Sequence, residues 1–385
     1  MQLLTRIPRL AYVWYIVEQE ITLFNGVPST LSFSDMRSLM PNSEDLFLAQ
    51  TAETWRELVA TKYGGSNNEI FQHDVELKHP LSLSTFHNMF IQDNSFQFRQ
   101  DVTAIHLRLL LCTIQTLVFQ YSQTVRFVPD EEIGSQNLPN LPTGTRYSVP
   151  REEELTYLLA RWYLPCRRVV LSDTGSQNLH TASTLVFHLV AMELYICYED
   201  VQPLAGKEGL SESRLLLPSF QRWVSSPRAT RALSHAGQLL RIVKSLGSEV
   251  VRPCWWPLAV SRAALVLWSY GIVVSLRPPK DQILTDSQPY YFESIDHDAY
   301  AEGAMFGTSR LRLVEQGCMP CLSNQDETLV PIVQITNILD ICLKMLEDGQ
   351  KFSSPLCASV QNFLQAVKSN LHMYERGLRS MQGFT

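Results

Sequence analysis

A chain of 385 residues has room for two or three average domains or for one large helical array. Hydrophobic residues make up 45% of it and charged residues only 18%, which excludes disorder throughout, because burial of that much apolar surface can offset the entropy of ordering. The formal net charge of -6 repels phosphate, so the chain alone is expected to be a poor binder of nucleic acid.

The first helix is predicted by apolar residues that recur at three- and four-residue spacing. This spacing places them on one face, which we expect to be buried, and Gly26 and Pro28 end the helix. Truncation of Trp14 would then cost about 3–5 kcal/mol, as for an aromatic side chain in a core. The neighbouring Tyr12 and Tyr15 are also expected in the core, because the interleaved cations of a base-stacking platform are missing. The stripe consists of Leu10, Val13, Trp14, Val17, Ile21 and Phe24.

Further helices are predicted by the same periodicity along the rest of the chain. Two of them are apolar on more than one face, which is typical of central helices wrapped by others. Pro227, behind a serine, is a good first-turn proline. Trp268 lies in another apolar helix, and the same cost of truncation is expected for it. The predicted helices cover about residues 42–64, 98–123, 183–198, 227–243, 257–276, 335–346 and 360–371.

The predicted fold is therefore all-α: an irregular multi-helix array with long loops, forming one domain over residues 1–385. Alternating strand patterns are nearly absent, with a short exception at 167–172. Two stretches near 128–150 and 277–288 are rich in loop-forming residues. Neither is flanked by a change of composition, so both are interpreted as loops inside one helical domain.

The cysteines and the apolar runs indicate an intracellular protein. The eight cysteines are scattered, mostly inside apolar runs, which is typical of free thiols in a reducing compartment. The N-terminus lacks the pattern of a signal peptide. The uncharged stretch between Arg262 and Arg277 is too short to cross a bilayer, so no membrane contact is expected.

Three patterns suggest chemistry, and each has a simpler interpretation. Residues 303–309 (GAMFGTS) resemble a phosphate loop without its lysine, which favours a glycine-rich turn. Cys318 and Cys321 form a CxxC pair without the two further ligands of a structural zinc, which favours two cysteines in a turn. Residues 296–298 (Asp-His-Asp) could orient an imidazole as a general base, but no nucleophile is in view, so a solvated turn is favoured.

Two acidic or histidine-containing groups also have structural interpretations. Residues 152–154 (Glu-Glu-Glu) follow Pro150 as the acidic first turn of a helix, which the helix dipole explains. His188 and Glu193 are too far apart for a helical metal pair, so His188 is expected to be a hydrogen-bonded core residue. The sequence therefore predicts no catalytic, cofactor-binding or metal-binding residue.

Four segments, in order, resemble the fungal-specific transcription factor domain, also called the middle homology region. The first has the arginine–leucine start, the aromatic-rich helix and the small-residue and proline turn of that family, although Val27 and Glu18 depart from its common residues. The other three resemble the subgroup that carries paired two-cysteine, two-histidine zinc fingers at its N-terminus. The segments are RLAYVWYIVEQEITLFNGVPSTLSFSDM (9–36), STLVFHLVAMELYICYEDVQPLAG (183–206), RATRALSHAGQLLRIV (228–243) and CWWPLAVSRAALVLWSYG (254–271).

The resemblance implies a nuclear transcription regulator of a metabolic or biosynthetic gene set, not an enzyme, with no cofactor. Met1 falls within the homology region and no zinc finger is found, so the domain is expected to be N-terminally incomplete and to lack its DNA-binding segment. It would act through that missing module or through other transcription proteins, without direct DNA binding by this chain alone, and a homodimer is allowed. Two alternatives stay open: an all-helical enzyme acting on an apolar small molecule, and a helical scaffold without a transcriptional role.

Overall fold

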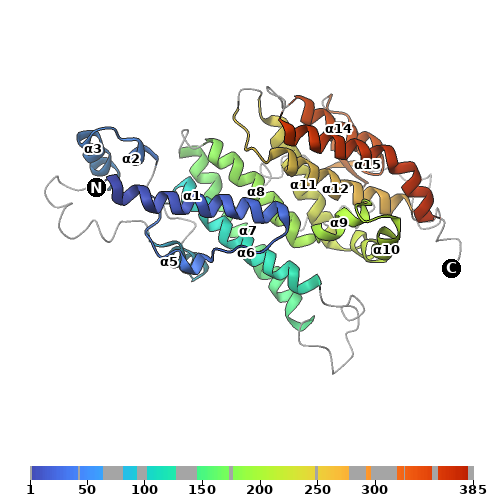
Figure 1. Ribbon diagram of the computed structural model, residues 1–385, viewed down its shortest axis with the longest axis horizontal. Helices are drawn as coiled ribbons and strands as arrows, with labels where there is room; N and C mark the ends of the chain where they lie inside the picture. Colours follow the sequence, from blue (N-terminus) through green and yellow to red (C-terminus); the bar gives the residue numbers. More distant parts are fainter. Residues whose placement is uncertain are drawn as a thin grey trace. The chain divides into compact units, whose positions relative to one another are not determined.

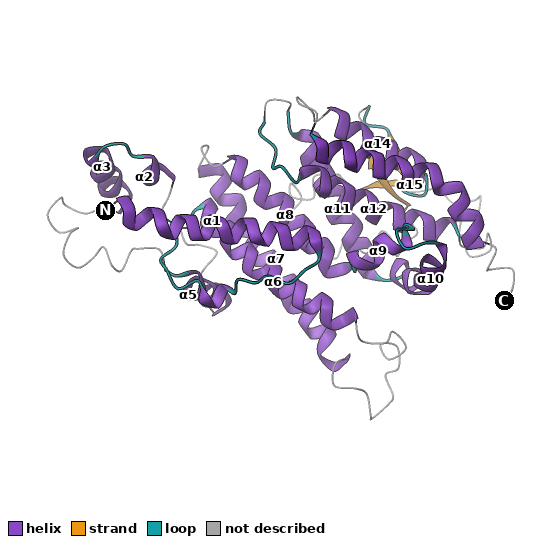
Figure 2. Cartoon of the chain, in the orientation of Figure 1, coloured by secondary structure: helices purple, strands orange, loops and turns teal. Residues whose placement is uncertain are grey.

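A computed structural model of the chain confirms the all-α fold (Figures 1 and 2). Of the two predicted loops, 277–288 lies outside the described residues, and so does most of 128–150. The structure describes residues 2–41, 44–63, 81–92, 102–126, 145–172, 177–247, 250–276, 292–295, 319–324, 326–348 and 354–379.

By its internal contacts the chain divides into two compact units. Unit 1 comprises Met1–Leu117 and Tyr157–Ser183, and unit 2 comprises Val118–Thr156 and Thr184–Thr385. No change of composition marks the boundary, because it falls inside three continuous helices. These helices are α6 (Ala104–Arg126), α7 (Thr145–Ser172) and α8 (Gln177–Tyr195).

Two predicted boundaries around α7 are wrong. The helix begins at Thr145, so residues 145–150 are helical and Pro150 lies within the helix instead of before it. The stretch 167–172, which alternates like a short strand, is the C-terminal end of the same helix. Local alternation over six residues is too short to outweigh a helix that continues from well-packed turns.

Unit 1 consists of segments of α6, α7 and α8 together with the N-terminal elements. The helix predicted behind Asn42 or Ser43 is two helices, and both capping candidates lie outside the described residues. Trp162 on α7 donates from Nε1 to the carbonyl oxygen of Leu107 on α6 at 2.7 Å, which fixes the two helices against each other. The N-terminal elements are α1 (Gln2–Asn25), the 3-10 turn η1 (Phe33–Asp35), α2 (Glu44–Leu48), α3 (Ala52–Tyr63) and α5 (Leu83–Gln92).

The prediction that the apolar stripe of α1 is buried is wrong, because the opposite face of the helix packs into unit 1. Trp14 is 66% exposed, whereas Tyr12 and Tyr15 are fully buried, as expected for them. The inward face is more polar, and several of its polar groups have partners: Tyr12 Oη donates to the carbonyl oxygen of Ser38 at 2.5 Å, and Gln19 Nε2 donates to Ser29 Oγ at 2.9 Å. The buried hydroxyl of Tyr15 has no hydrogen-bond partner among the described residues. The buried residues of this face include Tyr12, Tyr15, Gln19, Thr22 and Leu23.

Unit 2 is built around α12 (Trp256–Ser275), nearly every residue of which is buried. Helices α10, α11, α14 and α15 pack on it, and α14 and α15 (red in Figure 1) also pack on each other. Pro227 occupies the first turn of α11 behind Ser226, as predicted. The packed helices are α9 (Tyr198–Leu204), α10 (Leu210–Val224), α11 (Pro227–Ser245), α14 (Ile335–Asp348) and α15 (Pro355–Arg379).

A small sheet in unit 2 was not predicted from the sequence. Its three strands have the order β1 (Phe292–Ser294), β2 (Met319–Ser323), β3 (Leu329–Pro331), with β1 and β2 parallel and β2 and β3 antiparallel. Strands of three to five residues are too short to show an alternating pattern. Gly237 of α11 lets the helix meet the end of β1, since a Cβ there would lie 2.3 Å from the carbonyl oxygen of Ile295.

Among the described residues, two helices are long and apolar enough to cross a membrane by length and composition: Ala104–Val125 within α6, and α12. The prediction that the uncharged stretch after Arg262 is too short did not count the apolar residues that precede Arg262 in α12. Helices α8 and α9, bent by 77° at their junction, pass the same test only as a pair. In the structure, protein covers 72% of the apolar window of α6 and 83% of that of α12. Packing inside a helical array accounts for that apolar character.

Candidate functional site

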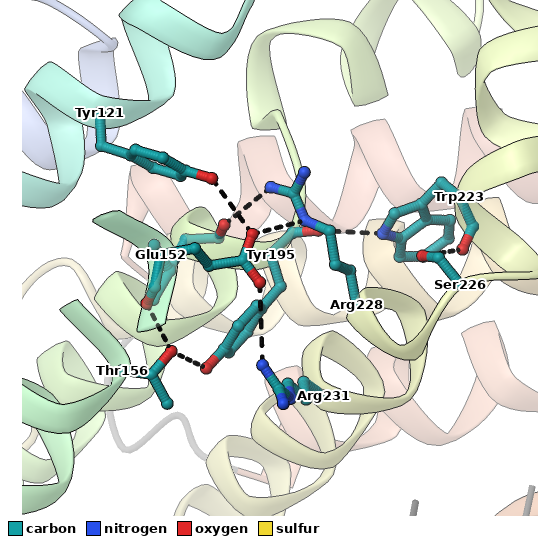
Figure 3. A network of polar contacts seen from close by, with 9 residues as sticks. Tyr121, Glu152, Thr156, Tyr195, Trp223, Ser226, Arg228 and Arg231 are labelled. Atoms are coloured by element: carbon teal, nitrogen blue, oxygen red, sulfur yellow. Dashed lines mark hydrogen bonds and ion pairs between the residues drawn. The ribbon is translucent and has the colours of Figure 1, made fainter. Parts of the chain in front are cut away.

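Glu152, on α7, lies at the centre of a polar network in unit 2 (Figure 3). Its Oε2 accepts a hydrogen bond from Tyr121 Oη of α6 at 3.1 Å and lies 3.3 Å from Nε of Arg228. Its Oε1 lies 3.7 Å from Nη1 of Arg231. Both arginines belong to the first turns of α11, so one carboxylate joins three helices.

The network continues from α7 to α8 through Tyr195. Thr156 Oγ1 donates to the carbonyl oxygen of Glu152 at 2.8 Å and shares a hydrogen bond of 2.9 Å with Tyr195 Oη. Arg228 Nη2 donates to the carbonyl oxygen of Leu194 at 2.9 Å, at the end of α8. Burial is the main cause that raises the pKa of Tyr195, so its phenol stays protonated and available for this network.

The junction between α10 and α11 is held to the same place. Trp223 Nε1 donates to the carbonyl oxygen of Tyr195 at 3.0 Å, and Ser226 Oγ donates to the carbonyl oxygen of Trp223 at 2.7 Å (Figure 3). The guanidinium of Arg231 lies 5.4 Å from the centre of the Tyr195 ring. The network therefore fixes the ends of α8 and α10 and the start of α11.

This role of Glu152 was missed by the sequence interpretation, which assigned the carboxylate to a helix dipole. The acidic run is not in the first turn, because α7 begins seven residues earlier than Glu152, at Thr145. Glu153 and Glu154 are exposed, as an outward acidic face predicts, but Glu152 points toward the arginines of α11. The sequence does contain an indication of such a partner. In the segment RATRAL, the spacing of Arg228 and Arg231 puts two positive charges on one side of a helix.

We expect Glu152→Gln to lower the free energy of unfolding by about 1–2 kcal/mol, because it removes a charge that two arginines and a phenol share. The arginine side chains are 34% and 36% exposed, and solvent screening keeps the effect in this modest range. Glu153→Gln, on the exposed side of the same turn, is the matched control and should change stability by less than about 0.5 kcal/mol. Urea denaturation of the three proteins measures both values. Equal effects of the two substitutions would contradict the assigned role.

A second cluster in unit 2 is the histidine pair of α8 and α11. His188 is a hydrogen-bonded core residue, as predicted, and its partner is His235: their Nδ1 atoms are 3.0 Å apart and both side chains are buried. Tyr195 stacks on His235 with its ring centre at 6.0 Å. Burial lowers the pKa of His188 well below its usual value and that of His235 to about 3, so both rings are neutral at physiological pH. One Nδ1 therefore donates and the other accepts.

Glu193, which is half-buried, and Arg262, which is buried, influence each other electrostatically in unit 2. Burial raises the pKa of Glu193, while the charge of Arg262 lowers it. Arg262 also lies over the ring of Tyr198, 4.2 Å from its centre. Arg262, a charged residue within the apolar helix α12, is thus in contact with another helix of the unit.

The residues with candidate chemistry are not brought together. Residues 296–298 and 303–309 lie outside the described residues, and so does Cys318. Cys321 lies in β2, fully buried, and not in the turn that was predicted. Among the described residues no group of three or more histidines, cysteines and carboxylates is placed to hold a metal ion.

A thiol–imidazole pair in unit 1 was not anticipated. Cys166 Sγ lies 3.5 Å from Nδ1 of His180, but the thiol is only 1% exposed. Burial lowers the pKa of His180 to about 4. A histidine that stays neutral does not supply the positive charge that stabilises a reactive thiolate, so the pair has the character of a core contact.

The comparisons with known proteins point in one direction. No protein-family model matches the chain, and no solved structure does. A transcription factor of Zymoseptoria tritici is 25% identical over 96% of this chain and 37% of its own length. "Transcription factor 1" of Elsinoe fawcettii is 25% identical over 89% of this chain and 34% of its own length, and transcription factor PfmaH of Pestalotiopsis fici is 25% identical over 94% and 36%.

The chain thus spans about a third of the length of these relatives. Their similarity covers both compact units, because it extends over nearly all of the chain. This similarity is to fungal transcription factors in general and does not single out the subgroup with two-cysteine, two-histidine zinc fingers. Over most of its length, the chain is a distant homologue of fungal transcription factors.

Proposed function

We propose that the chain is the helical regulatory part of a fungal transcription regulator that controls a metabolic or biosynthetic gene set in the nucleus. The observation that carries the proposal is the distant homology to fungal transcription factors over 96% of the chain. The ordered series of four segments, from residue 9 to residue 271, supports it independently of overall identity. The proposal includes that such a region works together with a DNA-binding module, of which the paired zinc fingers of the resembled subgroup are an example.

The proposed mode of action is through proteins and not through direct contact with DNA. The net charge is -6, and a surface of that sign gains nothing from releasing the counterions of DNA. The chain would therefore act on DNA through a partner or through another segment of a longer protein. The alternative of a helical enzyme acting on an apolar small molecule has no site among the described residues that favours it.

The test is a tethering experiment. The chain is fused to an unrelated DNA-binding domain and tagged with a fluorescent protein, and a reporter is placed behind the operator of that domain. We expect altered reporter expression from the tethered chain and none from the DNA-binding domain alone or from the untethered chain. A fusion that is folded and nuclear but leaves the reporter unchanged would count against the regulatory role. Turnover of an apolar small molecule by the purified chain would favour the enzyme.

A further inference from the structure

Helix α1 packs into unit 1 through its more polar face and leaves its purely apolar face exposed. The exposed face carries side chains that are 40–70% exposed, all of them large and apolar. Such a contiguous row is not explained by the scattered hydrophobic residues that every protein surface has. The exposed members are Leu10, Val13, Trp14, Val17 and Ile21, and half-buried Phe24 ends the row.

The spacing of this face has a period of 3.5 residues. Leu10, Trp14, Val17, Ile21 and Phe24 follow one another at steps of four, three, four and three, which is the a/d pattern of a coiled-coil seam. A straight helix that packs on a globular core has a broader stripe. We call these five residues the α1 seam.

We propose that the α1 seam binds the α1 seam of a second copy of this chain, forming a two-fold symmetric helix pair. The exposed fractions of its side chains correspond to about 500 Å² of apolar area, as large as the largest patches on monomeric proteins. Two such faces would bury about 1,000 Å², which is where specific interfaces begin. A two-fold pair satisfies both faces at once, because the same patch serves both copies.

The charges beside the seam favour a second copy over a different protein. Different helices select each other through free charges at the positions that flank the a/d row. Here the flanking carboxylates are Glu18 and Glu20, and both are held within their own chain. Glu18 accepts from the backbone N–H groups of Thr30 and Leu31 at 2.7 and 3.1 Å, and Glu20 accepts from Arg108 at 2.7 Å.

This leaves the seam without a free flanking carboxylate with which to select an unlike partner. It also means that two copies can approach without repulsion between unpaired carboxylates. The remaining flanking positions are Ala11, Val13 and Asn25, and none of them carries a charge. The seam therefore offers its own copy an apolar face without unpaired flanking carboxylates that would repel it.

The first experiment measures self-association by sedimentation velocity over a range of concentrations. We expect the wild-type chain to dimerise and the Trp14→Lys/Ile21→Lys variant to dissociate at least about tenfold more readily, since central aromatic anchors dominate interfaces. The matched control is Leu215→Lys/Met373→Lys, which places two lysines at equally exposed apolar residues of unit 2 (73% and 68%) and should associate like wild type. Circular dichroism confirms that each variant is folded.

The second experiment locates the interface. Val17 is the middle residue of the seam, so a two-fold axis brings it opposite its own copy in either helix orientation. In a Cys254→Ser background, which removes an exposed thiol, Val17→Cys should form an intermolecular disulfide on oxidation, and Leu215→Cys should not. A wild-type chain that stays monomeric, or a seam variant that dimerises as well as wild type, would overturn the proposal. So would a monomeric Val17→Cys variant whose introduced thiol is shielded from small thiol reagents. Neither experiment depends on the transcriptional role.

Discussion

Replacing Trp268 with alanine is expected to lower the free energy of unfolding by about 3–5 kcal/mol, the range for deleting a large aromatic side chain from a core. Trp268 is 1% exposed on α12, the central helix of unit 2. Its ring meets that of Tyr374 on α15 edge to face, with ring centres 6.4 Å apart. Truncation would leave a cavity between α15 and α12, the helix on which the others of this unit pack.

Two matched substitutions make the Trp268 result specific. The sequence predicts the same effect for Trp14→Ala. In the structure Trp14 is 66% exposed, so this substitution should lower the free energy of unfolding of the dilute monomeric protein by less than about 1 kcal/mol. Trp268→Phe should keep most of the stability, since the Nε1–H of Trp268 has no hydrogen-bond partner among the described residues and its loss removes no bond. Thermal and urea denaturation measure the series. A Trp268→Ala protein that melts like wild type would show that α12 is not the core helix.

Acidification is expected to destabilise unit 2 through the His188–His235 pair. Burial holds both rings neutral in the folded protein, whereas in the unfolded chain they take up protons below about pH 6.5. The unfolded state then binds more protons, so stability is full above pH 6.5 and is lost as the pH falls below it. Each neutral histidine contributes a slope of up to about 1.4 kcal/mol per pH unit, and the pair up to about 2.7. Arg231 and Arg241, which lie nearby, act in the same direction.

The measurement is the free energy of unfolding from urea denaturation at several values between pH 7 and pH 5. His235→Gln keeps a hydrogen-bonding group beside His188 and removes one titrating ring, so the slope should fall by up to about half of the pair's contribution. His372→Gln is the control, because that side chain is 85% exposed. If the slope of His235→Gln equals that of wild type, the buried pair is not the origin of the acid sensitivity.

The sequence predicts much of the fold because helical periodicity is a local property. The all-α class, the first-turn position of Pro227, the apolar helix around Trp268 and the core position of His188 all follow from residues within a few turns of each other. The resemblance to fungal transcription factors is likewise carried by contiguous segments. The short strands were missed because three to five residues contain too little alternation to be recognised.

The polar network and its centre could not be predicted, because their partners are distant in the sequence. Glu152 looks like any other member of an acidic run until α11 folds back and places Arg228 and Arg231 beside it. His188 likewise has its hydrogen-bond partner His235 on another helix, 47 residues away. Spacing within a helix records which residues share a face, but not what that face meets.

Helix α1 shows most clearly what the sequence determines and what only the tertiary structure decides. The sequence by itself determined that residues 10–24 form a helix with an apolar stripe, since the stripe needs only the 3.6-residue turn. The tertiary structure decided which face turns inward. It is the more polar face, because Gln19 and Glu20 meet Gln115 and Arg108 of α6, about 90 residues away, and a buried polar group is tolerated only where such a partner exists. The purely apolar face makes no hydrogen bonds that would fix its position, and in this chain it is exposed on the surface.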